Sequence, residues 1–329
     1  MRNVQASTMG ERLSDALDPV FDRKPTFFSD SRELAGWLAS LGFETYEFER
    51  AREAPDEHRH NAVVVPTDDE KILPYTEWHK LFHDARVLIV PLVSFDPAMD
   101  AARYTVDMLS RSRFETAVEL NRDWLSLLMN RKTPMVFGGE GCELVCELED
   151  DITVLKPKVE SALAPGEWES IGSYFEVGLV PMPEDFRPGF RPGYVVEGTL
   201  TVPGVAVAHH KQMHPKLRPL ASRAWRLFEE VREQGLFPLK MEIRNSRTTH
   251  VWAGERDLSG EIEELTNKRL ELVLNEMAFS TNAGIVPEHI DWAYNAQLNE
   301  GAIGIHVGLG DGVTGAHVDF ICPGVKLLG

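Results

Sequence analysis

The chain has 329 residues, of which 43% are hydrophobic and 26% are charged, so it is long enough for one large or two smaller globular domains. Its formal net charge of −18 argues against nucleic acid and anionic membranes as partners, because both are negatively charged. No apolar run approaches the length that crosses a bilayer, and residues 1–5 lack the apolar segment of an export signal, so we expect a cytoplasmic protein.

Strands and helices alternate between residue 24 and about residue 150. Four short strands are predicted, at residues 26–28, 43–48, 63–65 and 87–90. Helices are predicted between them at residues 32–41, with Ser31 as N-cap, and at residues 77–84. This rhythm predicts an α/β domain at residues 1–150 whose sheet is mainly parallel and flanked by helices.

The longest predicted helix follows at residues 96–131, with Asp96 as N-cap and Pro97 at the first helical position. Glycines at positions 138, 139 and 141 then precede a predicted strand at residues 144–148. A nucleotide-binding loop would lead from a strand into a helix, so these glycines instead predict a hairpin turn.

Beyond residue 150, prolines and glycines separate short apolar runs, which predicts an antiparallel, β-rich second domain at residues 151–329. Its strands are expected at residues 194–201, 240–243 and 249–252, and its helices at residues 219–234 and 259–272. The fold class is therefore α/β followed by α+β, and the candidate metal ligands lie in the second domain.

Four side chains near the C-terminus are candidates for a metal site. His317 and Asp319 are two residues apart, so a strand would place both on one face. His306 lies among apolar residues and Glu276 near the start of a strand or the end of a helix. Taken singly, each has a structural alternative: a surface pair, a buried core histidine or a helix-end carboxylate. Together, beside small residues, they predict nitrogen and oxygen ligands that suit Zn, Co, Mn or Fe(II).

Short motifs around these residues point to a known family. Residues 275–282 read Asn-Glu-Met-Ala-Phe-Ser-Thr-Asn, residues 304–310 read Gly-Ile-His-Val-Gly-Leu-Gly, and the His317 and Asp319 pair follows. In order and context they resemble the motifs of the thermophilic metallo-aminopeptidases (aminopeptidase T or leucyl aminopeptidase type), whose fold is shared with the 2,5-dihydroxypyridine dioxygenases. The resemblance covers about residues 135–325.

The resemblance implies a set of ligands and roles. A glutamate ligand of the family corresponds to Glu176, which joins the four C-terminal candidates in a five-residue set: Glu176, Glu276, His306, His317 and Asp319. One or two divalent ions are implied, with Zn, Co or Mn favoured over Fe. Catalytic roles are implied for Glu176, as general base, and for Glu276. A peptide ligand or substrate and a homodimer are implied as well.

The chain also departs from the peptidases. Val313 lies where they have a tyrosine, Gly301 lies where they have a lysine, and the segment from His306 to His317 is far shorter than theirs. Two functions are therefore considered first: a metal-dependent peptide hydrolase, and a non-catalytic protein that presents a precursor peptide to partner enzymes, as in crocagin biosynthesis. An Fe(II) ring-cleaving dioxygenase and a former metal site with only a structural role are the further alternatives.

Overall fold

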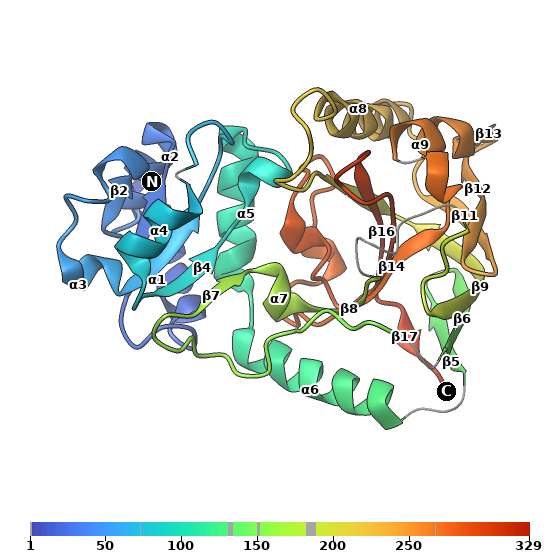
Figure 1. Ribbon diagram of the computed structural model, residues 1–329, viewed down its shortest axis with the longest axis horizontal. Coiled ribbons are helices and arrows are strands. Elements are labelled where there is room, and N and C mark those ends of the chain that lie inside the picture. The colour runs from blue at the N-terminus through green and yellow to red at the C-terminus, as the bar shows by residue number, and fades with distance from the viewer. Residues whose placement is uncertain (1, 73, 131–133, 150–151, 182–188, 267) are drawn as a thin grey trace.

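The computed structural model describes residues 2–72, 74–130, 134–149, 152–181, 189–266 and 268–329. Three sheets with helices around them make up the fold (Figure 1). The N-terminal strands and helices lie on the left of this view and the two β-rich layers on the right. None of the helices in these ranges is long and apolar enough to cross a membrane.

The N-terminal sheet, sheet A, is parallel throughout, with the strand order β2-β1-β3-β4-β7. Its strands are β1 (Thr26–Ser29), β2 (Thr45–Glu47), β3 (Asn61–Val65), β4 (Arg86–Ile89) and β7 (Trp168–Ser170). Every residue of β1 and β3 is buried, as expected for parallel strands that are covered on both faces. The predicted parallel sheet is confirmed.

A helix precedes the first of these strands, and further helices lie between the strands in the chain. They are α1 (Arg2–Leu17), α2 (Arg32–Ser40), α3 (Asp56–Arg59), α4 (Tyr75–Phe82), α5 (Met99–Arg111) and α6 (Phe114–Asn130). The predicted N-cap of α2 is confirmed, because the Ser31 hydroxyl accepts a hydrogen bond from the Leu34 amide.

The prediction of one long helix at residues 96–131 is wrong. The helix begins only at Met99, and Asp96 accepts a hydrogen bond from the Ala98 amide in a turn before it. It then breaks at Ser112, whose backbone is extended. The break is held by Asn282, which donates to the Ser112 hydroxyl and accepts from the Arg113 amide. A contact with a distant segment, which no local pattern reports, thus divides α5 from α6.

The two remaining sheets are antiparallel, which confirms the predicted β-rich character of the C-terminal part. Sheet B contains, in order, β13 (Arg256–Asp257), β12 (Arg247–Ala253), β11 (Leu239–Arg244), β9 (Tyr194–Val202), β6 (Cys142–Leu148), β5 (Met135–Gly139) and β17 (Lys326–Leu327). Sheet C contains, in order, β10 (Gly204–Ala208), β16 (His317–Pro323), β15 (Gly304–Leu309), β14 (Leu274–Ser280) and β8 (Glu176–Leu179).

The hairpin predicted at the glycines is confirmed, since β5 and β6 pair directly around it. The domain boundary at residue 150 stays a prediction, and the strands near it cross over: β5 and β6 belong to sheet B, whereas β7 adds to sheet A. The helices in this part are α7 (Gly172–Phe175), α8 (Pro219–Glu233) and α9 (Ser259–Leu265). The helix predicted at residues 259–272 therefore ends early, at Leu265. The carbonyl of the next residue, Thr266, lies where a Cβ on Gly315 would be.

Sheet C has one apolar and one polar face, and this asymmetry positions the site. Alternate residues such as Phe279, Val307 and Phe320 are buried in the main hydrophobic core with the strands of sheet B and with α8. The residues between them point to the opposite face, toward the N-terminal layers. The Trp124 ring of α6 stacks on Phe279 at 4.2 Å and closes one end of this core.

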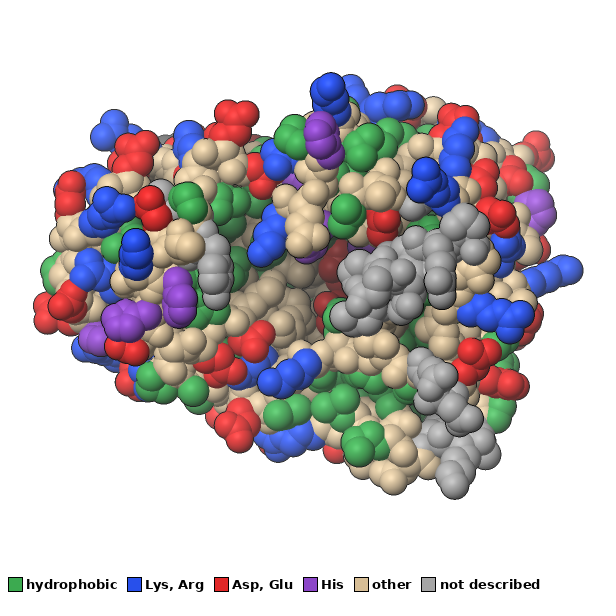
Figure 2. All heavy atoms as spheres, viewed as in Figure 1, with side chains coloured by type: hydrophobic (Ala, Val, Ile, Leu, Met, Phe, Trp, Pro, Cys, Tyr) green, Lys and Arg blue, Asp and Glu red, His purple; other side chains and the backbone are tan. Residues whose placement is uncertain are grey.

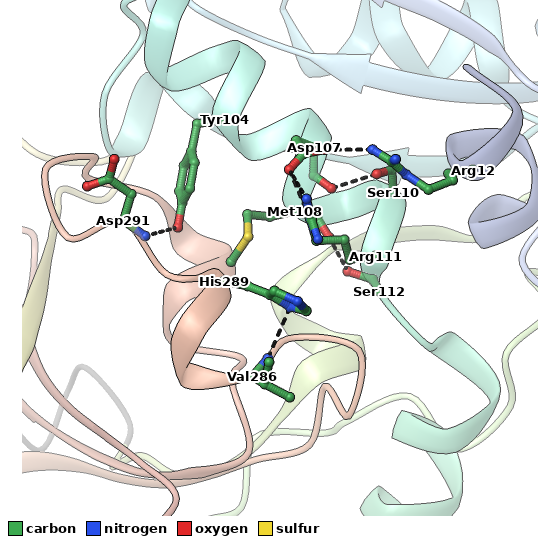
Figure 3. Close-up of polar contacts among 10 residues, drawn as sticks. All are labelled: Arg12, Tyr104, Asp107, Met108, Ser110, Arg111, Ser112, Val286, His289 and Asp291. Carbon is green, nitrogen blue, oxygen red and sulfur yellow. Dashed lines mark hydrogen bonds and ion pairs between the residues drawn. The ribbon is translucent and has the colours of Figure 1, made fainter. Parts of the chain in front are cut away.

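Helix α5 joins the N-terminal layers to the loops that precede β15 (Figure 3). The Tyr104 hydroxyl donates to the Asn299 side chain at 2.6 Å and accepts from the Asp291 amide at 3.1 Å. Its ring stacks on Tyr294 with the centroids 4.8 Å apart. About one turn further along the helix, Asp107 pairs with Arg12 of α1 at 2.9 Å. These contacts fix the N-terminal layers against the polar face of sheet C.

Candidate metal centre

The five residues predicted from the sequence lie together on the polar face of sheet C. Glu176 begins β8, Glu276 lies in β14, His306 in β15, and His317 and Asp319 in β16. These four strands are neighbours in the sheet, so side chains from distant parts of the chain meet. Glu276, Gly308 and Asp319 are paired across three strands in one row.

The side-chain atoms are as close as metal ligands are to one another. The His317 Nε2 atom lies 3.0 Å from Asp319 Oδ1 and 3.1 Å from Glu276 Oε2. The His306 Nε2 atom lies 3.5 Å from Glu176 Oε2 and 3.7 Å from Glu276 Oε1. Two groups result, one of Glu176, Glu276 and His306 and one of Glu276, His317 and Asp319, each with its ligand atoms within 4.8 Å of one another. Glu276 belongs to both and is the centre of the cluster.

Each histidine ring is oriented by a hydrogen bond at Nδ1, the nitrogen that points away from the carboxylates. Metal-binding histidines are oriented in the same way. The Nδ1 atom of His317 lies 2.7 Å from the Gly310 carbonyl oxygen, which can only accept. The Nδ1 atom of His306 lies 3.2 Å from the Ser280 hydroxyl, which itself donates to the Glu300 carbonyl. In both neutral rings the proton therefore sits on Nδ1, and the Nε2 lone pair faces the carboxylates.

This arrangement brings hydrogen-bond acceptors together around a common point. With neutral imidazoles, two lone pairs and three carboxylates face a common point, and only protons or a metal ion can hold such groups together. Asp319 Oδ1 is buried and has no hydrogen bond in proper geometry within the described residues, although it lies 3.0 Å from His317 Nε2. The residues present fit a divalent ion bound by nitrogen and oxygen.

Without a metal, the cluster holds protons tightly. Burial raises the pKa of Glu176 to about 8, and the negative charge of Glu276 adds to this effect. Burial opposes the charged form of His306, but the hydrogen bond to Glu276 and the nearby carboxylates raise its pKa to about 9. The pKa of His317 is raised well above its ordinary value by Asp319 and Glu276, against the effect of burial. The pKa of Glu276 is lowered by these two histidines, again against burial.

These shifts predict opposite pH dependence for the metal-free and the metal-loaded protein. The ordinary pKa of His306 is 6.5 and its folded value about 9, so its contribution to stability is complete below pH 6.5 and is lost as the pH rises through 9. Glu176 acts in the same direction, from 4.5 to about 8. A metal ion needs deprotonated ligands, so its stabilising effect grows over the same range. Thermal denaturation with chelator should show a falling midpoint between pH 6.5 and 9, and with zinc a rising one.

The matched controls are His306→Gln, which should flatten the slope in chelator, and His214→Gln at an exposed site, which should leave it unchanged. Equal slopes with and without metal would contradict an ion at this cluster.

Sequence reasoning missed Glu300, which follows η6 (Gln297–Asn299). This residue is buried, and its Oε1 atom has no hydrogen-bond partner within the described residues. Burial raises the pKa of Glu300 well above its ordinary value, and the charges of Asp319 and Glu176 add to this effect. The sequence did offer one sign of Glu300: it is a carboxylate beside Gly301, just before the histidine motif. Because Glu300 lies in a loop, however, no strand or helix period predicts which way its side chain points.

The cluster opens into a cavity of about 370 Å³. One wall follows the strands of sheet A, with Pro91, Ser94 and Phe95, and the other is formed by Val180, Pro181 and His209 on the side of sheet C. Buried polar atoms without partners in the described residues line it at Asn275, Gln297, Glu300 and Asp319. Figure 2 shows the molecule hollowed between its two halves, with acidic side chains inside the hollow.

Comparison with known proteins gives one family and one distant fold. A family model described as crocagin biosynthetic protein CgnE/B matches residues 22–328. No sequence among the curated proteins is significantly similar to the chain. Among solved structures, wild-type AmpT from Thermus thermophilus is similar with a TM-score of 0.50 and 13% identity, over 99% of this chain and 95% of that chain. The similarity to AmpT concerns the fold alone, whereas the family match spans nearly the whole sequence.

Proposed function

Because this chain belongs to the family of crocagin biosynthetic proteins CgnE/B, we propose that it is a peptide-binding protein of natural-product biosynthesis. It holds a segment of a ribosomal precursor peptide in the cavity above the acid and histidine cluster and presents it, uncut, to partner enzymes. The expectation of a peptide hydrolase, which follows from the aminopeptidase resemblance, becomes the second candidate.

The observation that carries the proposal is the composition of the cavity. Its volume of about 370 Å³ is within the range of ligand sites, about 300–1,000 Å³. Cleavage of an amide needs donors aimed at the oxygen that becomes negative in the transition state. The described residues that line this cavity include no lysine, arginine or tyrosine, so the side chains left to serve as such donors are amides, histidines and one serine. Peptide binding needs only shape and polar partners, which Asn275, Gln297 and the histidines supply.

The connection between β15 and β16 supports binding without cleavage. In the peptidases that the sequence resembles, a long segment lies between the two histidines. Here β15 ends at Leu309 and β16 begins at His317. The short turn is closed by Asp311, which accepts from the amides of Val313 and Thr314. The residues between the two strands are therefore engaged in the turn, and Val313 offers no group for proton transfer.

A bound ion would be held by the five residues of the cluster. Such an ion would supply charge that polarises a carbonyl or lowers the pKa of a bound water. Zn, Co or Mn match the ligand set best. In a binding protein the same ion would supply charge for a peptide carbonyl or carboxylate, so metal binding alone does not decide between the two candidates.

One observation favours the second candidate, a metal-dependent hydrolase. The Glu176 carboxylate lines the cavity, and its Oε2 atom lies 3.5 Å from His306 Nε2. A carboxylate held beside a bound ion and open to a cavity would be suited to general acid–base work. In this function Glu176 takes a proton from the attacking water, while Glu276 and the histidines stay in place.

Capture of intact peptides tests the two candidates against each other. The protein is incubated with a library of random twelve-residue peptides with and without Zn, Co or Mn, and retained peptides are identified by mass spectrometry. We expect full-length peptides in every condition. Ala208→Trp fills the cavity and should abolish retention, whereas Val286→Trp, at an exposed site outside it, should not. Metal-dependent cleavage of the retained peptides would favour the hydrolase, and no retention would exclude the binding function.

A further inference from the structure

The cavity above the cluster is one end of a longer groove. It shares Phe95 and His209 with a second cavity of about 710 Å³, which lies against α8. The second cavity shares Thr67, Asp68 and Glu70 with a third, of about 860 Å³. The hollow therefore continues from the polar face of sheet C along sheet A, and we call its second and third cavities the acidic groove.

The acidic groove follows the edge of sheet A at which ligands of parallel sheets bind. The lining residues lie in the segments that follow the strand ends: Asp30 one residue after β1, Glu49 two after β2, Asp68 three after β3, and Asp96 after β4 and η2 (Leu92–Ser94). All strands are parallel, so these ends meet at one edge. The order β2-β1-β3-β4-β7 reverses between β1 and β3, and such a point leaves a crevice outside the carboxyl ends of the strands.

Acidic side chains predominate in this groove. The third cavity is lined by five of them and by two basic ones, Arg32 and Lys71. Both basic side chains have carboxylate partners, since Arg32 pairs with Glu47 at 3.2 Å and Lys71 with Asp68 at 3.7 Å. The second cavity is lined by five acidic side chains and by two arginines, Arg218 and Arg226, of which Arg218 pairs with Asp69 at 3.0 Å. The groove thus keeps an excess of negative charge, which attracts a cationic ligand.

Asp30 adds an observation that is independent of this charge count. Its residue is only 9% exposed, and it lines the third cavity. The Oδ1 atom accepts from the amide and the hydroxyl of Thr67, at 2.7 and 3.0 Å. The buried Oδ2 atom has no hydrogen-bond partner within the described residues. A buried carboxylate oxygen without a donor is costly, and a ligand that brings an ammonium or guanidinium group would remove that cost.

An anionic ligand fits this edge poorly. Nucleotides often bind parallel sheets at helix N-termini, and α2 begins here. The Ser31 hydroxyl, however, already accepts from the Leu34 amide, and Asp30 and Asp68 stand close by. A phosphate would meet these negative charges, and no glycine-rich loop follows β1.

We propose that the acidic groove binds a lysine- or arginine-rich segment of the same peptide whose other part lies above the acid and histidine cluster. This inference rests on the proposed function. It names the chemistry of the ligand. It also gives the path of the peptide across the molecule, which leads from sheet C along the carboxyl edge of sheet A. Asp69 is excluded as a contact, because His209 at 3.2 Å and Arg218 already pair with it.

Labelled hexalysine, hexaglutamine and hexaglutamate peptides test the groove by fluorescence anisotropy with the full chain. We expect hexalysine alone to bind, with affinity that falls at higher salt. The exposed pair Glu49→Gln/Glu70→Gln should weaken hexalysine binding by about fivefold or more. Asp30→Asn, which keeps the acceptor for Thr67, should weaken it by a similar factor. Glu233→Gln/Glu255→Gln changes the net charge equally at exposed sites outside the groove and should change binding by less than about twofold.

The outcomes separate the groove from the proposed function. Equal weakening in both double variants would show general attraction to an acidic protein and would overturn the groove, even if library peptides are still captured above the cluster. Conversely, if hexalysine distinguishes the double variants while no library peptide is retained, the groove stands as a cation site and the precursor-peptide function falls. Ala208→Trp, which blocks only the first cavity, should leave hexalysine binding unchanged.

Discussion

Glu276→Gln is expected to abolish metal binding at the cluster, with a loss of affinity of more than about 100-fold for zinc. Glu276 is the only residue that belongs to both ligand groups found among the described residues. Its two oxygens lie 3.1 Å from His317 Nε2 and 3.7 Å from His306 Nε2. Glutamine keeps the volume but replaces one oxygen by a donor, so it can neither bridge nor balance the charge of an ion. Isothermal titration with zinc and with cobalt measures the effect.

The same substitution should also weaken the metal-free protein at neutral pH. The two histidines are then protonated, and the Glu276 carboxylate balances their charge. Removing one partner of a buried ion pair costs about 3–5 kcal/mol, because the other charge stays buried. We therefore expect a lower free energy of unfolding in chelator for Glu276→Gln and no change for Glu288→Gln, at an exposed position. Unchanged zinc affinity in Glu276→Gln would show that the cluster is not the metal site.

The part of the site within the C-terminal strands could be predicted from sequence because it follows local rules. His317 and Asp319 are two residues apart, and a strand places both on one face. His306 is in the neighbouring strand, and a short turn keeps the two strands in register. Glu176 is different, because nothing in its own surroundings connects it to β14. Only the resemblance to a family identified it, and the structure now places it beside His306 at 3.5 Å.

The errors have a common physical cause, which is contact between segments distant in sequence. Apolar periodicity continues through Ser112, but Asn282 binds the backbone and side chain there and divides the helix. The helix that begins at Ser259 ends at Leu265, where Gly315 packs directly against the carbonyl of the next residue, Thr266. Glu300 was missed for the same reason, since its burial depends on β14 and β16 and on no pattern near it. Local propensity describes the elements well and their interruptions poorly.

Gly308 carries the second prediction with a large effect. In the cross-strand row it lies between Glu276 and Asp319, and its missing side chain leaves the space in which the ligands meet. A Cβ atom on Gly308 would lie 2.8 Å from Glu276 Cβ, 2.8 Å from His317 Cε1 and 3.1 Å from Asp319 Oδ1. All three side chains are held by the sheet and by their partners. None of them can move away from an added Cβ atom without displacing the others. The geometry of the cluster therefore requires glycine here, although glycine has no side chain that could bind an ion.

Gly308→Ala is expected to lower zinc affinity by at least tenfold, about 1.4 kcal/mol, because the ligands can no longer converge. Overpacking a buried site costs about 1–3 kcal/mol, so the free energy of unfolding in chelator should fall by a similar amount. Gly36→Ala is the matched control, since open space surrounds its position in α2 and alanine favours a helix. Full zinc affinity in Gly308→Ala, with the stability loss present, would mean that the ion binds elsewhere. If Gly308→Ala loses zinc affinity and Gly36→Ala does not, the ion binds on the face of sheet C where the ligands of the four strands meet.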